Sequence, residues 1–413
     1  MAAGAGTETG SSRNGMMAAD DGCALSETAG REAGGEQMQR DFNEGNNCLM
    51  CRNQIFTGHD SDVLGCQRRK EGMSCKFEQR GMTLNEILAD VPKSEIIGDN
   101  LIRAYAKINS PAYEKIICTV SGGYDSDIVI DICTKCDREK KIEYVWFNTG
   151  LEYKATKDHL KELERKYGIE IKERKAKKPI PVACKENGLP FLSKKISEYI
   201  GRLQRHGFRW EDRPFDELYR EYPKCKAALR WWCNEWGEGS QFNISRHKYL
   251  KEYMIDNPPT EVRFSADCCK YGKKDVLHEE LKEGGYNLNI TGMRKMEGGA
   301  RSTAFKSCFK ENEGGCDVYM PVWWYLDSTK EIYRTHYGIE RSLCYEEYGL
   351  RRTGCAGCPY GRNFEEELEV IERYEPNLFK AVNKIFGKSY SYTRNYRRYA
   401  TFMKAFEKEG DGA

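Results

Sequence analysis

Cysteine is the residue type whose abundance and spacing most clearly suggest chemistry in this sequence. The chain contains 18 cysteines. Three groups stand out: Cys48, Cys51, Cys66 and Cys75; the adjacent pair Cys268 and Cys269; and the Cys-x-x-Cys pair Cys355 and Cys358. Thiolates bind zinc and iron–sulfur clusters. Because the first residues lack the basic and apolar pattern of a secretory signal, we expect reduced thiols that act as ligands rather than disulfides.

A second candidate for chemistry is the short polar segment that follows the apolar residues 116–120. It consists of Ser121, Gly122, Gly123, Tyr124, Asp125 and Ser126. Glycine lacks the Cβ atom that would keep the backbone away from an anion, and the N-terminus of a following helix attracts negative charge. The segment therefore predicts a phosphate-binding turn, in which Asp125 caps the helix or helps to hold Mg²⁺. An ordinary capped strand-to-helix turn is the alternative.

Two further segments would meet this turn in a parallel sheet. They contribute Asn148, Thr149 and Gly150 after one strand, and Gly292, Arg294 and Arg301 after another. Ligands of an open α/β sheet bind at the carboxyl ends of its strands. Arg294 would then bind a phosphate or sulfate through two parallel hydrogen bonds, with Arg301 adding to it. A surface salt bridge is the alternative for Arg294.

Together, these segments resemble the PP-loop enzymes, which are the N-type ATP pyrophosphatases of the adenine nucleotide alpha hydrolase superfamily. "SGGYDS" is similar to the PP-loop, "WFNTGLEYKAT" to the strand end of the phosphoadenosine phosphosulfate reductase branch, and "TGMRKMEGGAR" to its Gly-x-Arg segment. The resemblance covers roughly residues 115–362. It implies an enzyme with a parallel, doubly wound α/β sheet that binds Mg²⁺ and an adenine nucleotide of the ATP or adenylylsulfate type. It assigns catalysis to Asp125, Ser126 and Arg294.

The cysteine pairs add a cofactor to this resemblance. An adjacent pair followed much later by Cys-x-x-Cys is similar to the [4Fe–4S] pattern of assimilatory adenylylsulfate reductases, of the DNA phosphorothioation ATP-pyrophosphatase subunit and of phage-borne relatives. The resemblance implies a [4Fe–4S] cluster, with zinc or free core thiols as alternatives. Its ligands would be Cys268, Cys269, Cys355 and Cys358. For the N-terminal group, structural zinc is the first interpretation. A second cluster, or two unrelated cysteines beyond the Cys-x-x-Cys pair, are the alternatives. Cys133 and Cys136 fall on an expected helix and are interpreted as packing residues.

Two features differ from the reductases of this branch. No cysteine follows Cys358, whereas the reductases carry a C-terminal thiol that attacks sulfur, and Tyr124 stands where relatives often have lysine. We therefore expect a reductase-like ATP pyrophosphatase or sulfurtransferase of sulfur metabolism, in which a nucleophile attacks the α-phosphorus and pyrophosphate leaves. The alternative is nucleic-acid thiolation, or a nucleic-acid-binding sensor that uses the same fold without reductase activity.

Two segments that mix arginine with aromatic residues make nucleic acid, either tRNA or DNA, an expected partner. They contain Arg202, Arg205, His206, Arg209 and Trp210, and Tyr390, Tyr392, Arg394, Tyr396, Arg397, Arg398 and Tyr399. Such patches contact phosphates and stack on bases; a solvated helix face whose tyrosines pack on the domain is the alternative. A sulfur-donor protein is a further expected partner. With a net charge of +2 and no apolar run near the roughly 20 residues that span a bilayer, we expect a cytoplasmic protein without membrane contact.

The elements that would position these residues alternate between strands and helices. Apolar runs predict strands at 115–120 and 142–150, and residues 169–175 are expected to form a third strand. Residues 154–168 predict an amphipathic helix that ends at Gly168. This alternation favours a parallel sheet wrapped by helices. The expected parts are a disordered tail (1–45), a cysteine-rich metal module (46–80), the PP-loop domain (81–362) and a helical C-terminal extension (363–413).

Overall fold

A computed structural model describes residues 54–56, 63–66, 81–298, 304–313 and 315–410 of the chain, which divides into two units. The smaller unit contains an antiparallel hairpin of β1 (Gln54–Phe56) and β2 (Val63–Cys66), in which Gln54 pairs with Cys66. The expected tail at 1–45 lies outside the described residues, as do Cys48, Cys51 and Cys75. The metal module at 46–80 therefore stays a prediction.

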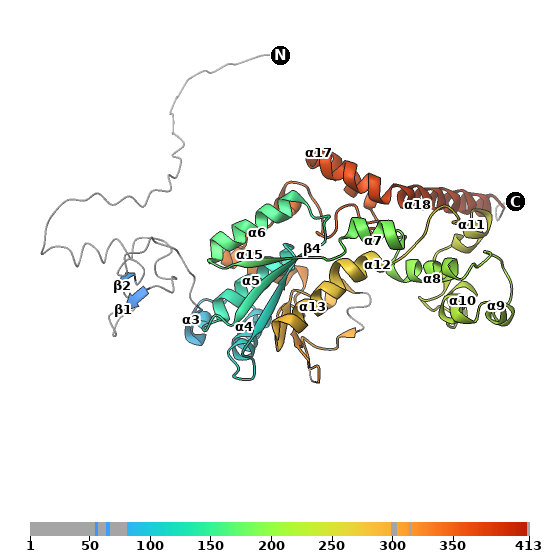
Figure 1. Cartoon of the computed structure of the whole chain (residues 1–413). Coiled ribbons are helices and arrows are strands. Elements are labelled where there is room, and N and C mark those ends of the chain that lie inside the picture. Colours follow the sequence, from blue (N-terminus) through green and yellow to red (C-terminus); the bar gives the residue numbers. More distant parts are fainter. Residues whose placement is uncertain (1–53, 57–62, 67–80, 299–303, 314, 411–413) are drawn as a thin grey trace, which may run out of the picture. The chain divides into compact units, whose positions relative to one another are not determined.

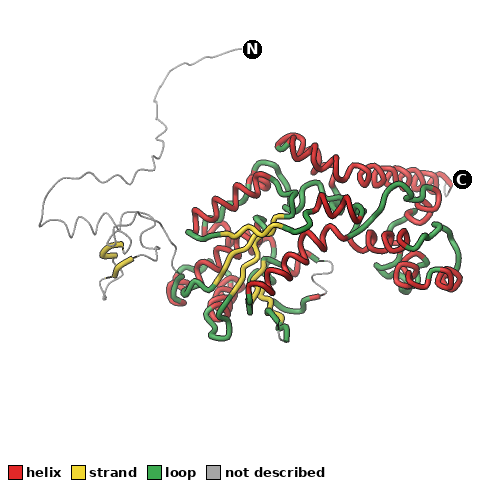
Figure 2. Tube along the Cα trace, viewed as in Figure 1, coloured by secondary structure: helices red, strands yellow, loops and turns green. Residues whose placement is uncertain are grey.

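The larger unit is built around a six-stranded sheet with the order β5-β4-β3-β6-β8-β7 (Figure 1). Its strands are β3 (Ile116–Val120), β4 (Ile142–Asn148), β5 (Ile171–Lys175), β6 (Leu288–Thr291), β7 (Phe309–Lys310) and β8 (Asp317–Tyr319). Neighbouring strands are parallel, except that β7 runs antiparallel to β8. Figure 2 shows these strands flanked by helices. The α/β class and the largely parallel, doubly wound sheet predicted from the sequence are confirmed.

The alternation of side chains along β3 divides the core between the two faces of the sheet. Ile116 and Cys118 belong to the larger cluster of buried apolar side chains, whereas Ile117 belongs with Val145 to a smaller one. The larger cluster is packed by α3 (Leu84–Ala89), α4 (Glu95–Ile108), α5 (Tyr124–Cys136), α6 (Lys154–Tyr167) and α15 (Asp327–Tyr337). The smaller one is packed by Leu281 of α13 (Asp275–Gly284). Both faces of the sheet are thus covered, as a parallel sheet requires.

A second apolar core is formed by helices that lie between β5 and β6 in the sequence. They are α8 (Lys194–Arg205), α9 (Phe215–Glu221), η2 (Pro223–Cys225), α10 (Lys226–Trp232), η3 (Ile244–Arg246) and α11 (Leu250–Asp256). We call residues 194–264 the helical subdomain. Its buried side chains, such as Leu203 and Trp232, form one cluster with Tyr396 of the long helix α18 (Pro376–Gly410). The C-terminal helix therefore packs on the helical subdomain.

A third cluster of buried side chains joins segments that are far apart in the sequence. It includes Cys184 of α7 (Ile180–Asn187), Cys268 of α12 (Asp267–Cys269) and Tyr390 of α18. It also includes residues of α6, α16 (Leu343–Glu346) and α17 (Phe364–Tyr374). The turn η4 (Lys270–Lys274) continues α12 as a π-helix, a geometry that frequently occurs at functional sites.

Several local predictions are confirmed by the structure. The expected amphipathic helix is α6, and Gly168 caps its C-terminus with φ +59°, in the left-handed region that favours glycine. Cys133 and Cys136 are completely buried on α5, in agreement with a packing role. None of the helices in the described ranges combines the length and apolar character that a bilayer crossing needs.

Candidate functional site

The segment after β3 forms a tight turn that requires glycine at its second residue. Gly122 has φ +65°, and a Cβ atom there would lie 2.6 Å from Cγ2 of Thr156. The Ser121 N–H donates to Ser126 Oγ at 3.1 Å, and the Gly123 N–H donates to Ser121 Oγ at 3.3 Å. Both serine hydroxyls thus accept from backbone N–H groups and fix the shape of the turn.

Helix α5 begins directly after this turn without a side-chain cap. Its N-cap is Gly123, which has no side chain that could make the capping hydrogen bond. A Cβ atom on Gly123 would lie 2.9 Å from Thr353 Oγ1, and Tyr345 OH accepts from the Tyr124 N–H at 3.3 Å. The capped turn considered as an alternative is therefore not what the structure contains. The helix N-terminus, with its positive dipole end, is approached by hydroxyls instead.

Arg294 reaches the first turn of α5 from the neighbouring strand. Gly292, just after β6, approaches so closely that a Cβ atom there would lie 3.1 Å from the carbonyl carbon of Asp125. Arg294 is buried; its Nε lies 2.9 Å from Asp125 Oδ2, and its Nη1 donates to the carbonyl oxygen of Tyr325 at 3.1 Å. Since β4 and β6 flank β3 on opposite sides, this is where the strand order reverses, the usual ligand site of an open α/β sheet. Arg301 lies outside the described residues.

A second buried cation, Lys330, joins this arrangement and was missed in the sequence. Its Nζ lies 2.7 Å from Asp125 Oδ1 and 3.5 Å from Asp327 Oδ1, while Arg294 Nη2 lies 3.0 Å from the same Asp327 oxygen. Burial raises the pKa of Asp327, but the charges of Arg294 and Lys330 outweigh it and hold that pKa below its ordinary value. Two cations and two carboxylates therefore meet at the start of α5.

The side chain of Tyr124 turns toward α15. Its hydroxyl donates to Glu331 Oε1 at 3.0 Å, and its ring lies under the Lys330 ammonium, 4.4 Å from Nζ to the ring centroid. Burial, and next the bond to Glu331, raise the pKa of this tyrosine well above its ordinary value, so it is a neutral donor. Lys330 thus supplies a positive charge next to the residue that replaces the lysine of the relatives.

A buried ion pair lies one turn further along α5. Asp127 is fully buried, and its Oδ2 lies 3.0 Å from Nε2 of His159 on α6. Burial raises the pKa of Asp127 despite the opposing effect of the histidine. Burial lowers the pKa of His159, but its bond and charge interaction with Asp127 prevail and raise it above the ordinary value. This pair ties α5 to α6 beneath the turn, and no motif in the sequence pointed to it.

The turn after β4 is held by a carboxylate. Glu152 Oε1 accepts from the Thr149 N–H at 3.0 Å and from its hydroxyl at 2.5 Å, and Glu152 Oε2 accepts from the Gly150 N–H at 3.1 Å. Asn148 Oδ1 accepts a further bond from the Gly150 N–H at 2.8 Å. Gly150 has φ +90°, a conformation that glycine permits. The contacts of Asn148, Thr149 and Gly150 with a nucleotide remain a prediction.

The Cys-x-x-Cys segment lies directly against this turn. Cys355 Sγ lies 3.6 Å from Thr149 Oγ1, and the Ala356 N–H donates to the carbonyl oxygen of Leu151 at 2.8 Å. From the other side, Gly272 of η4 packs so that a Cβ atom there would lie 3.8 Å from Cβ of Thr149. The segment around Cys355 and the helical turn that follows Cys268 and Cys269 therefore meet at the carboxyl end of β4.

The four thiols of these pairs are close enough to interact. Burial, and next the neighbouring Cys355, raise the pKa of Cys358 to about 12. The pKa of Cys269 is raised first by its bond to Cys268, and Lys273 opposes this shift. A fifth thiol, that of Cys184, is the largest cause of the raised pKa of Cys268. Cys184 was not singled out in the sequence. Within the described ranges, no three His, Cys, Asp or Glu side chains are arranged as metal ligands, so the metal stays a prediction.

The arginine and aromatic segments separate into packing residues and unpaired cations. In the first, Trp210 is buried and Arg209 lies 3.6 Å from Glu211, with a second ion pair to Glu221. Arg202 and Arg205 have no carboxylate partner within 4.0 Å in the part of the chain that the structure describes.

In the second segment the tyrosines serve the fold. Tyr392 OH donates to the carbonyl oxygen of Asn257 at 2.8 Å, and Tyr396 OH donates to that of Lys248 at 3.0 Å. Tyr390 is completely buried. The tyrosines of α18 therefore anchor the helix, as the alternative interpretation held.

The geometry can be compared with known proteins at this point. Residues 115–195 match the phosphoadenosine phosphosulfate reductase domain. The matched residues include the Gly-rich turn, the turn after β4 and His159. The resemblance to the reductase family is therefore confirmed over residues 115–195. Arg294, Lys330 and the cysteine pairs lie beyond it. None of the curated protein sequences matches the chain.

Solved structures of several nucleotide-related proteins are similar to the chain at low identity. Phosphoadenylyl-sulfate reductase from Candida auris is 15% identical with a TM-score of 0.34, covering 66% of this chain and 92% of that one. The U34-tRNA thiolase NcsA from Methanococcus maripaludis, solved with its [4Fe–4S] cluster, is 13% identical with a TM-score of 0.31, covering 86% and 88%. NAD synthetase from Campylobacter jejuni is 11% identical with a TM-score of 0.29, covering 76% and 96%.

Proposed function

We propose that the chain is a PP-loop enzyme that binds an adenine nucleotide of the ATP or adenylylsulfate type and acts at its α-phosphorus. One observation carries this proposal: Asp125, Arg294 and Lys330 meet at the N-terminus of α5. This helix begins at Gly123 without a cap from that residue, next to the Gly-rich turn. Such an N-terminus attracts phosphate through its free N–H groups and its dipole. The match of residues 115–195 to the reductase domain supports the same proposal.

The chain's own groups would work by positioning and by neutralising charge. Arg294 can bind two phosphate oxygens at once, and Lys330 adds a second positive charge from α15. Asp125 holds both cations in place before the nucleotide arrives, so little reorganisation is needed when negative charge develops. A nucleophile then attacks the α-phosphorus, the bond to the bridging oxygen breaks, and pyrophosphate leaves when the nucleotide is ATP.

Magnesium fits the same place because it prefers carboxylate and phosphate oxygens. Asp125 and Asp327 are the carboxylates that would hold it, and both already lie beside the cations that approach the phosphates. Bound Mg²⁺ would offset the charge of the nucleotide's phosphates. Because Asp125 pairs with Arg294 and Lys330 in the structure, these partners would rearrange when the ion binds.

We further propose that Cys268, Cys269, Cys355 and Cys358 hold a [4Fe–4S] cluster, with zinc as the alternative. Four thiolates are a suitable donor set for either group. The contact of Cys355 with Thr149 supports this assignment by placing the thiol beside the turn. Burial raises the pKa of Cys355, and the charge of Lys273 opposes that rise, as a nearby cation favours thiolates. When bound, the cluster would supply a redox-active or sulfur-binding centre beside the nucleotide.

The test is pyrophosphate release by the anaerobically purified chain with ATP and Mg²⁺, alongside AMP release from adenylylsulfate. We expect activity that falls about 100-fold or more in Arg294→Ala, the usual loss when one charge-stabilising donor is removed. Arg213→Ala is the matched control, since Arg213 pairs with Glu211 at 2.7 Å in the helical subdomain. Equal turnover in Arg294→Ala, or no product from either nucleotide, would overturn the proposal.

A further inference from the structure

The helical subdomain carries a set of cations that no carboxylate neutralises. They are Arg202 and Arg205 on α8, Lys224 in η2, Lys226 and Arg230 on α10, and Arg263. None of them has a carboxylate within 4.0 Å among the residues that the structure describes. By contrast, Arg213 in the same subdomain pairs with Glu211 and Glu221. Two classes of arginine are therefore present, one that serves folding and one that is free to meet an anion.

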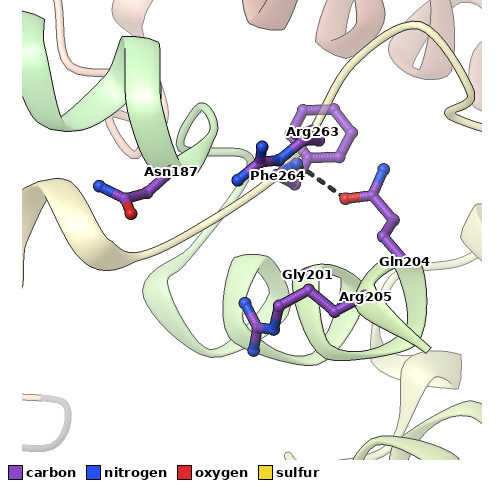
Figure 3. Close-up of a pocket in the computed structure, with 6 residues that line it drawn as sticks. All are labelled: Asn187, Gly201, Gln204, Arg205, Arg263 and Phe264. Carbon is purple, nitrogen blue, oxygen red and sulfur yellow. Dashed lines mark hydrogen bonds between the residues drawn. The ribbon is translucent and has the colours of Figure 1, made fainter.

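Two neighbouring cavities collect these cations. The first has a volume of about 330 Å³ and is lined by Arg205 and Arg263 together with Asn187, Gly201, Gln204 and Phe264 (Figure 3). The Arg263 guanidinium donates to the carbonyl oxygen of Glu186 at 3.0 Å, which fixes its position and leaves its charge uncompensated. Gly201 lets the two walls approach, because a Cβ atom there would overlap the carbonyl oxygen of Phe264.

The second cavity adds an aromatic surface to the positive charge. It has a volume of about 250 Å³ and is lined by Arg202, Lys224, Lys226, Ala227, Arg230 and Trp236. Arg230 lies over the Trp236 ring, 4.0 Å from its centroid, while donating to the carbonyl oxygen of Glu235. Phe242, which is 44% exposed, has its ring centroid 6.0 Å from that of Trp236. Flat apolar surface and fixed positive charge therefore lie side by side.

Helix α8 joins the two cavities into one surface. Arg202 lines the second cavity and Arg205 the first, and residues three apart lie on the same side of a helix. Phosphates that follow one another along a strand are matched by such a row of cations, and unstacked bases are matched by Trp236 and Phe242. An acidic peptide would use the cations but would make no use of the exposed ring of Phe242.

We propose that this surface binds single-stranded nucleic acid, with the six cations on the phosphates and with Trp236 and Phe242 against bases. The surface shares no residue with the nucleotide site, so it does not depend on the chemistry proposed above. It differs from the tyrosines of α18, whose rings are engaged in packing.

The test uses fluorescence anisotropy with a labelled 20-nucleotide single strand of mixed sequence, as RNA and as DNA, over a range of salt. We expect Arg202→Ala/Lys226→Ala/Arg230→Ala to weaken binding at least tenfold at low salt. The slope of log K against log[salt] should fall by about 2, since each lost phosphate contact on a single strand contributes about 0.7. Trp236→Ala should weaken binding about tenfold through lost stacking.

Lys157→Ala/Lys161→Ala/Lys282→Ala is the matched control, because it removes the same charge from exposed lysines of α6 and α13 that have no carboxylate within 4.0 Å among the described residues. It should bind within twofold of the unaltered chain. Pyrophosphate release and the thermal midpoint should be unchanged in both triple variants, which separates this proposal from the nucleotide proposal. Equal loss in the control, no binding by the unaltered chain, or equally tight binding of polyglutamate would overturn the assignment.

Discussion

Lys330 Nζ lies 2.7 Å from Asp125 Oδ1, although the two residues are far apart in the sequence and belong to different helices. The contact places a buried ammonium group on the first turn of α5, where the Gly-rich turn ends. Tyr124 cannot provide that charge, and its ring instead supports Lys330 from below at 4.4 Å. The positive charge of this site is therefore supplied from α15 rather than from the turn itself.

Removing that charge should impair the proposed reaction. We expect Lys330→Met to lower kcat/KM for pyrophosphate release by about 100-fold, because one charge-stabilising donor is lost, and Lys330→Arg to recover part of it. Lys157→Met, an exposed lysine of α6, is the control. Steady-state kinetics with ATP checks this prediction. Unaltered kcat/KM in Lys330→Met would show that Lys330 takes no part in the proposed reaction.

The conformation of the turn can be tested through stability. Gly122→Ala should lower the free energy of unfolding by more than the roughly 1–2 kcal/mol that a left-handed alanine costs, because Thr156 also blocks the new methyl group. Gly207→Ala is matched, since Gly207 has φ +68° with no atom within 4 Å of an added Cβ, and it isolates the backbone cost. Urea unfolding of both variants should show the difference. Adding Thr156→Ser to Gly122→Ala should recover the steric part, and equal losses at the two glycines would contradict the clash.

The buried Asp127–His159 pair predicts how stability depends on pH. Because the pKa of His159 is raised in the folded chain, its contribution is complete below its ordinary pKa of about 6.5 and is lost as the pH rises through the raised pKa. The stability difference between the unaltered chain and His159→Gln should therefore shrink as the pH rises above about 6.5. Urea titrations across this range measure it. A difference that stays constant or grows would show that the histidine is neutral when folded.

The cysteine pairs predict the metal content. Anaerobic purification should give about four irons and four sulfides per chain with a visible absorption band, and Cys355→Ser should lose them. Cys233→Ser is the control, since its thiol only bonds to the carbonyl oxygen of Arg213. Iron, zinc and sulfide analysis decides the matter: zinc without iron after anaerobic preparation would replace the cluster with the zinc alternative.

Local patterns predicted much of the fold. The apolar runs located β3 and β4 because strands buried on both faces are almost continuously apolar. By contrast, β5 lies at the edge of the sheet and consists mostly of charged residues. Gly168 marked the end of α6 because a left-handed cap favours glycine. The helical subdomain was not separated from the sheet in the sequence, since its amphipathic helices have the same period as the helices that cover a sheet.

The candidate site was predictable only where its residues sit in one short segment. The Gly-rich turn and Arg294 carry such signals, whereas Lys330 gains its role from a contact with Asp125 that forms when distant segments fold together. Glu152 lies beside the turn that it holds, but no motif in the sequence singled it out. A lysine followed by a glutamate on a polar helix face looks like any solvated surface until the partner helix is known. The tyrosines of α18 show the reverse case, because the structure uses them to anchor that helix, as the alternative interpretation held.

The bond between the Ala356 N–H and the carbonyl oxygen of Leu151 makes the cysteine loop a continuation of the turn after β4. A displacement of Thr149 would be transmitted to Cys355 through this hydrogen bond and through the 3.6 Å contact between Thr149 Oγ1 and Cys355 Sγ. The electronic spectrum of any group held by these thiols would then act as a built-in reporter of nucleotide occupancy. Linkage is reciprocal, so the charge state of that group would change the affinity of this turn for the nucleotide that we propose it binds.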